Sequence, residues 1–106
     1  MSIDIVRGRI YAAEIEDRGE KFYLAISNNH RNRALPDFLA VQLTTTPKPD
    51  IDSVVTLDHG DHPWTGWVPC DNVEKVYRDE VTRDLGALPP PTMRRVDSAL
   101  RAALGL

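Results

Sequence analysis

Short stretches of β-branched, aromatic and other apolar residues, separated by turn-forming residues, dominate the first three quarters of the chain. Stretches of this kind, bounded by Gly, Pro, Asn and Asp, predict β-strands. The stretch at 21–27 is almost wholly apolar, which predicts a central strand covered on both faces. The expected strands are 7–15, 21–27, 37–45, 51–57, 64–68 and 73–77.

The polar segments between these strands predict turns and loops. Asp17 and Gly19 favour a hairpin turn at 16–20. Residues 28–33 predict a surface loop with one helical turn, and 79–85 a further short helix or turn. The segment His59-Gly-Asp-His-Pro63 predicts a polar turn, because two histidines and an aspartate do not complete a rigid zinc site.

At the end of the chain the spacing of hydrophobic residues changes. Apolar residues recur there at helical spacing: Met93, Val96, Leu100, Ala103 and Leu104. They predict a helix over about 92–104, with Thr92 as its N-cap after the stiff Pro89–Pro91 connector. The chain is therefore expected to be one domain over 1–106. Its fold class is mainly β with a C-terminal helix, and the strands of about 5–77 form a small barrel or two packed sheets.

Composition places the chain among ordinary soluble globular proteins. It has 106 residues, of which 42% are hydrophobic and 27% charged. No apolar run approaches the ~20 residues of a membrane span, and the N-terminus lacks the pattern of a signal peptide. The single cysteine, Cys70, agrees with a reducing compartment. We therefore expect a cytoplasmic protein that does not contact membranes.

The charges are unevenly distributed. Residues 34–74 hold seven acidic residues and one lysine, whereas 1–33 hold six basic and five acidic residues. Such a distribution argues against attraction of a polyanion by the whole molecule. It leaves room for a local basic groove built from the first third of the chain.

Five short motifs follow one another along the chain: Arg7-Gly-Arg-Ile-Tyr11, Leu24-Ala-Ile-Ser-Asn28, Val41-Gln-Leu-Thr-Thr45, Trp67-Val-Pro-Cys-Asp-Asn-Val73 and Val96-Asp-Ser-Ala-Leu100. Their succession resembles the MazF/PemK family of toxin endoribonucleases. The resemblance implies an SH3-like barrel of the MazF/PemK/CcdB type, a homodimer, and cleavage of single-stranded RNA without a metal or other cofactor. It also implies a partner antitoxin whose acidic C-terminal tail lies over the RNA site.

The family's catalytic groups can be matched to this sequence one at a time. Metal-free cleavage uses the ribose 2′-OH as nucleophile, and it needs donors for the charged phosphorane as well as an acid and a base. In the family an Arg opens the second strand and a Thr ends the third. Thr44 matches that Thr, while Lys21 stands in place of the Arg and lacks its bidentate fork. Arg18 is a further cation for the same phosphate, and Asp71 matches an Asp used as a base in some members.

The remaining expectations concern RNA binding. The segment between the first two strands is several residues shorter than in the family, and it forms part of one wall of the family's RNA groove. Trp64 and Trp67 are candidates for stacking on bases, although strand tryptophans also fill cores and dimer interfaces. The residues expected to contact RNA are Arg9, Tyr11, Glu20, Gln42, Thr45 and Trp64.

Two alternatives stand beside the endoribonuclease. The first is a non-enzymatic toxin of the same fold, either a CcdB-like gyrase poison or a catalytically inactive member. Lys21 in place of Arg, the short loop and the acidic middle third favour it. The second is a barrel that binds peptides or serves as a structural subunit, because a fold alone does not settle a function.

Overall fold

The structure is a computed structural model that describes residues 3–106. Five strands form a large antiparallel sheet: β1 (Arg9–Glu14), β2 (Glu20–Ala25), β3 (Asp37–Gln42), β6 (Val73–Tyr77) and β7 (Val81–Ala87). Two more form a small sheet: β4 (Val54–Thr56) and β5 (Trp67–Pro69). The two α-helices are α1 (Asn29–Ala34) and α2 (Pro90–Leu104).

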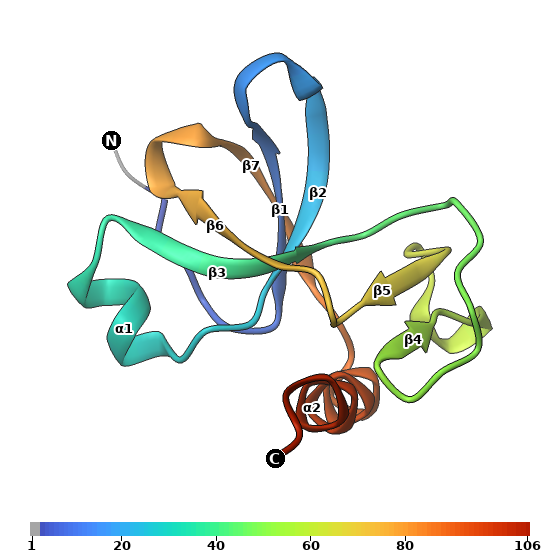
Figure 1. Ribbon diagram of the computed structural model, residues 1–106. Coiled ribbons are helices and arrows are strands. Elements are labelled where there is room, and N and C mark those ends of the chain that lie inside the picture. The colour runs from blue at the N-terminus through green and yellow to red at the C-terminus, as the bar shows by residue number, and fades with distance from the viewer. Residues whose placement is uncertain (1–2) are drawn as a thin grey trace.

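The large sheet bends back on itself. Its strand order is β6-β3-β2-β1-β7, so its two edge strands are consecutive in the sequence. Only a 3₁₀ turn at Arg78–Glu80 separates these edges, and the sheet therefore curls to bring them together (Figure 1). Side chains that point into the curl form one hydrophobic core, in which the rings of Tyr11 and Phe38 meet edge to face with centroids 5.8 Å apart.

A second core lies on the other face of the large sheet. Ile10, Leu24 and Val41 pack there against Val68 of the small sheet and Val96 of α2. The second half of β2 is consequently buried on both faces, which confirms the prediction for that half. The first half of β2 remains exposed, and this is the part that lines the candidate site described below.

Most expected elements are present, and the mainly β fold with a C-terminal helix is confirmed. Within residues 3–106 one isolated bridge, between Thr44 and Trp67, links the two sheets, so no continuous ladder closes a barrel. The prediction of a helix or turn at 79–85 is wrong for most of its length, because β7 occupies 81–87 and pairs with β1. In the described part of the chain, neither helix is long and apolar enough to cross a membrane.

The prediction that Thr92 caps α2 is also wrong. The helix begins two residues earlier, after Pro89, and two prolines fill its first positions, where their missing N–H groups are not needed. Thr92 is instead buried, and its hydroxyl hydrogen-bonds the carboxylate of Asp61.

Asp61 ties the loop after β4 to α2. The residue is only 1% exposed, and its carboxylate also accepts hydrogen bonds from the Arg95 guanidinium and the Asp58 backbone N–H, each at 2.8 Å. Burial raises the pKa of Asp61, but the bonds from Thr92, the Asp58 amide and Arg95 outweigh it and hold the pKa below its usual value. The carboxylate is therefore charged at neutral pH.

We expect Asp61→Asn to lower the free energy of unfolding by about 2 kcal/mol at pH 7, because hydrogen bonds to a charged group are lost. A lowered pKa stabilises the fold above the unfolded value of about 4, and this stabilisation disappears as pH falls through the folded value. The difference between wild type and variant should therefore shrink between pH 5 and pH 2. Urea unfolding across this range measures it, with Asp52→Asn as an exposed control. A difference independent of pH would contradict a role for the charge.

Candidate active site

A cavity of about 670 Å³ opens where the large sheet meets the small one. The first half of β2, the end of β3, the loop before β5 and one residue of β7 supply its walls. Its lining residues are Glu20, Lys21, Phe22, Gln42, Leu43, Thr44, Thr45, Thr46, Pro63, Trp64, Thr65 and Leu85. Of the residues expected to act on RNA, it therefore gathers six: Lys21, Thr44, Glu20, Gln42, Thr45 and Trp64.

Lys21 and Thr44 line the cavity from neighbouring segments of the chain. β2 and β3 pair antiparallel as far as Tyr23 and Gln42, and the Leu43 N–H donates to the Phe22 carbonyl at 2.9 Å, which continues the pairing by one residue toward the cavity. Beyond that point the Thr44 backbone pairs with Trp67. The lining therefore contains a cation from β2 and a hydroxyl from the segment that follows β3.

The backbone of Thr44 is fixed from two sides. Its N–H donates to the Trp67 carbonyl at 3.1 Å, and its carbonyl accepts the Trp67 N–H at 2.8 Å. The Thr44 hydroxyl oxygen accepts the Thr46 N–H at 3.1 Å. A hydroxyl that accepts from a backbone amide keeps its own hydrogen for another acceptor. Thr44 can therefore donate to an anionic oxygen in the cavity.

The charges around Lys21 favour an anionic ligand. Among residues 3–106, Lys21 takes part in no salt bridge. Its neighbour Glu20 is paired, because its carboxylate accepts from Arg83 at 2.6 Å and from the Thr82 hydroxyl at 2.7 Å. These hydrogen bonds lower the pKa of Glu20, so it is ionised and its charge is balanced by Arg83. The charge of Lys21 remains available.

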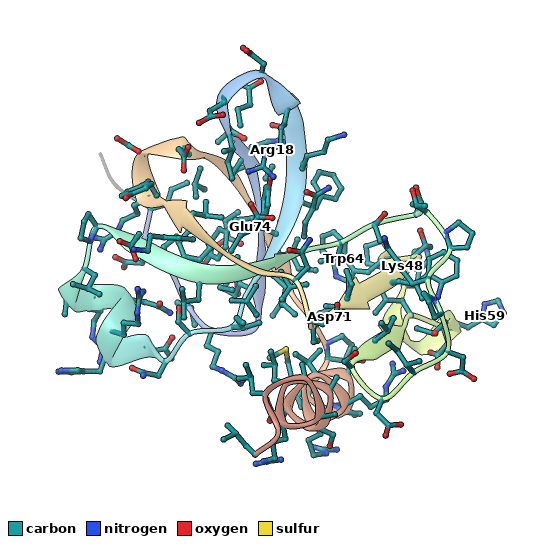
Figure 2. All side chains as sticks on the ribbon, in the orientation of Figure 1. Arg18, Lys48, His59, Trp64, Asp71 and Glu74 are labelled. Carbon is teal, nitrogen blue, oxygen red and sulfur yellow. The ribbon has the colours of Figure 1, made fainter. Side chains whose placement is uncertain are left out.

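Four of the expected residues lie outside the cavity lining. Arg18 pairs with Glu74 at 3.0 Å, and Figure 2 shows the two side chains approaching each other within the curled sheet. Asp71 is exposed in the turn between β5 and β6. Arg9 pairs with Asp84 of β7 at 3.0 Å. Of the four expected catalytic residues, Lys21 and Thr44 line this cavity, whereas Arg18 and Asp71 do not.

The expectation that Tyr11 contacts RNA is wrong. Its ring is fully buried inside the curl. Its hydroxyl donates to the Asp4 carbonyl at 3.1 Å and accepts the Val6 N–H at 2.8 Å. Both the ring and the hydroxyl are thus already engaged within the fold.

Sequence reasoning missed six lining residues: Phe22, Leu43, Thr46, Pro63, Thr65 and Leu85. Leu85 was assigned to a helix or turn, so its place on a strand beside the cavity could not be foreseen. Thr46 follows the end of β3. Phe22 was not among the expected site residues, although an aromatic residue next to the candidate cation was itself a signal.

A curled β-sheet with a C-terminal helix, and a cavity that sets a cation beside a hydroxyl, is the arrangement expected of a toxin endoribonuclease. Residues 5–104 match the family described as PemK-like, MazF-like toxin of type II toxin-antitoxin system. The chain belongs to this family.

Two curated relatives have the same degree of similarity. Endoribonuclease MazF4 of Mycobacterium tuberculosis and endoribonuclease MazF1 of Mycobacterium bovis are each 42% identical to this chain over 101 residues. The alignments cover 95% of this chain and 93% of each relative. The comparison supports the predicted class of toxin endoribonuclease and not the alternative of a gyrase-binding toxin.

Solved structures agree with the fold. A mycobacterial endoribonuclease in complex with its cognate antitoxin superposes with a TM-score of 0.87 at 41% identity, covering 96% of both chains. The MazE-MazF complex of Deinococcus radiodurans (Form-II) gives a TM-score of 0.81, covers 98% of both chains, and is 20% identical. At that lower identity the likeness shows the fold alone.

Gly66 allows the close approach that holds Thr44. It has φ +95°, and a Cβ added to it would overlap the Thr44 carbonyl oxygen. We expect Gly66→Ala to break the Thr44–Trp67 bridge, to destabilise the fold by about 2–4 kcal/mol, and to abolish RNA cleavage. Unfolding and cleavage assays measure these effects.

Gly86→Ala is the matched control for this variant. Gly86 has φ +108°, but a Cβ there would meet nothing within 4 Å. Gly86→Ala therefore introduces the strain of a positive φ without an overlap of the new Cβ with a neighbouring atom. If the two variants lose stability and activity equally, strain alone explains Gly66, and the close contact with Thr44 is unimportant.

Proposed function

We propose that this protein is a sequence-selective, metal-independent endoribonuclease that cleaves single-stranded RNA through its own 2′-OH, with Lys21 and Thr44 as the catalytic pair. The observation that carries the proposal is that both residues line one cavity. The family supplies the reaction class. The residue roles follow from the chemistry that the reaction requires.

The 2′-oxygen attacks the adjacent phosphorus, and the bond from phosphorus to the 5′-oxygen of the next nucleotide breaks. Negative charge grows on the phosphoryl oxygens in the transition state, where the Lys21 ammonium and the Thr44 hydroxyl stabilise it. The Lys21 ammonium is also positioned to protonate the leaving 5′-oxygen. Within residues 3–106, Glu20 carries the one carboxylate among the lining residues. We therefore assign Glu20 the role of the base that accepts the proton of the 2′-OH.

The test is cleavage of a long mixed-sequence RNA in EDTA. We expect wild type to cut at a few short motifs. Thr44→Ala and Lys21→Ala should each lower the rate by about 10²–10³-fold, because each removes one preorganised donor from the charged transition state. Thr44→Ser and Lys21→Arg, which keep a hydroxyl and a charge, should retain most of the rate. Glu20→Gln should lower kcat and leave KM nearly unchanged.

Two controls locate the cation. Lys75→Ala removes an exposed lysine of β6 outside the cavity lining and should leave cleavage unchanged. Arg18→Ala should have a small effect, because Arg18 pairs with Glu74. An Arg18→Ala loss as large as that of Lys21→Ala would overturn the assignment of Lys21. Intact RNA after incubation with folded wild type, free of antitoxin, would overturn the proposed activity.

The same cavity suggests how the protein is inhibited. The solved mycobacterial relative is in complex with its cognate antitoxin. We propose that this chain acts in the cytoplasm as a homodimer and binds an antitoxin whose acidic C-terminal tail covers Lys21. The tail would then compete with RNA for one cationic wall. Lys21→Ala should weaken tail binding and reduce its dependence on salt, as measured by titration with the acidic tail peptide at increasing ionic strength.

A further inference from the structure

The geometry points to a binding site for a single RNA base at the corner that Phe22 and Trp64 form, next to the scissile phosphate. This inference rests on the proposed function, because the base belongs to the RNA held by Lys21 and Thr44. Phe22 is 39% exposed, which is unusual for a large aromatic side chain in a small protein. Both rings line the cavity, Phe22 from β2 and Trp64 from the loop before β5.

The two rings form a corner. Their centroids are 6.2 Å apart and their planes meet at 85°. In such an edge-to-face pair, the edge of one ring points at the face of the other. Trp64 also packs against the second core, whereas Phe22 keeps part of its ring exposed to the cavity. A base that stacks flat on one ring therefore meets the second ring at its side. Every base has a face suited to this contact, and stacking on protein aromatic rings is a common way to hold single-stranded RNA.

Strand periodicity explains why Phe22 reaches the cavity instead of the core. Phe22 shares a face of β2 with Leu24, which is fully buried in the second core. Phe22 lies two residues closer to the strand's start, where its ring meets Trp64 at the cavity instead of the packed interior. An aromatic residue that continues a core face into a polar cavity is placed to take an apolar ligand surface.

The corner is held in place on both sides. The Phe22 carbonyl accepts the Leu43 N–H at 2.9 Å, which fixes the backbone beside β3. The Trp64 backbone N–H donates to the Asp61 carbonyl at 2.8 Å. The Asp61 side chain in turn accepts a hydrogen bond from Arg95 of α2. A preorganised site loses less conformational entropy when the ligand binds. The rings therefore present a nearly fixed surface to the base.

Polar groups beside the corner can read the edge of that base. Gln42 and Thr45 line the same cavity. The Gln42 side chain offers an amide oxygen and an NH₂ group, so it can match a donor or an acceptor on a base edge. Stacking supplies affinity with little sequence preference, and these polar groups supply selectivity. Phe22 is thus proposed as a base-binding residue that the family resemblance alone does not assign.

The experiment measures binding of a 2′-O-methyl copy of the shortest RNA that wild type cleaves, which cannot react. Phe22→Ala should weaken binding about 5- to 150-fold, the range expected for one stacked base. Phe22→Trp should restore affinity because it restores an aromatic face. Phe22→Leu should not, because leucine keeps apolar volume but has no ring. Tyr77→Ala, at a 47% exposed aromatic outside the cavity lining, is the control and should bind as wild type.

Abasic substitutions then locate the base. Wild type should lose affinity when one particular nucleotide beside the cut is abasic. The Phe22→Ala variant should bind the intact and the abasic RNA equally, because the substitution and the missing base remove the same contact. If Phe22→Leu binds as wild type, or if no abasic position loses its effect in Phe22→Ala, the base site is overturned while wild-type cleavage leaves the proposed function standing. Failure of wild type to cleave unmodified RNA overturns the proposed function itself.

Discussion

The backbone bridge between Thr44 and Trp67 is the contact on which the site depends. It joins two sheets that otherwise pair only within themselves in residues 3–106, and it forms because Gly66 lets the chains approach. The bridge places Thr44 beyond the last residue of β3, yet holds it as firmly as a strand residue. The cavity lies at this junction, and its walls come from the large sheet and from the loops that lead to and from the bridge. The packing of the two sheets therefore also determines the geometry of the candidate site.

Charge pairing reconciles an acidic chain with an anionic substrate. The chain carries a formal charge of −3, and much of its acidity lies between β3 and β6. Several of these carboxylates are already paired with arginine: Asp37 with Arg31, Asp61 with Arg95, and Glu74 with Arg18. Pairs near the surface contribute little to stability, about 0–1 kcal/mol each. The pair that lies at the cavity is Glu20 with Arg83, which balances the carboxylate next to Lys21.

The sequence predicted the fold class because alternation and turn residues are local signals. It did not predict β7, since the polar, exposed residues Thr82, Arg83 and Asp84 interrupt the alternation of that strand. Motif resemblance located Lys21 and Thr44, and the structure places both in the lining of one cavity. Tyr11 was misplaced because a strand tyrosine can point to either face, and only the curl of the sheet decides which face is interior. The local hydrophobic pattern thus predicted most helices and strands, while the curvature of the large sheet determined which side chains reach the site.

The position of Cys70 determines how the protein responds to oxidation. The thiol is fully buried, and burial together with the nearby charge of Asp71 raises its pKa to about 12. Oxidants and disulfides react with the accessible thiolate, a form that is almost absent here at neutral pH. Because the chain has one cysteine, the folded protein presents no reactive sulfur to cross-link with another molecule. Oxidation of this cysteine therefore does not alter the cavity while the protein stays folded.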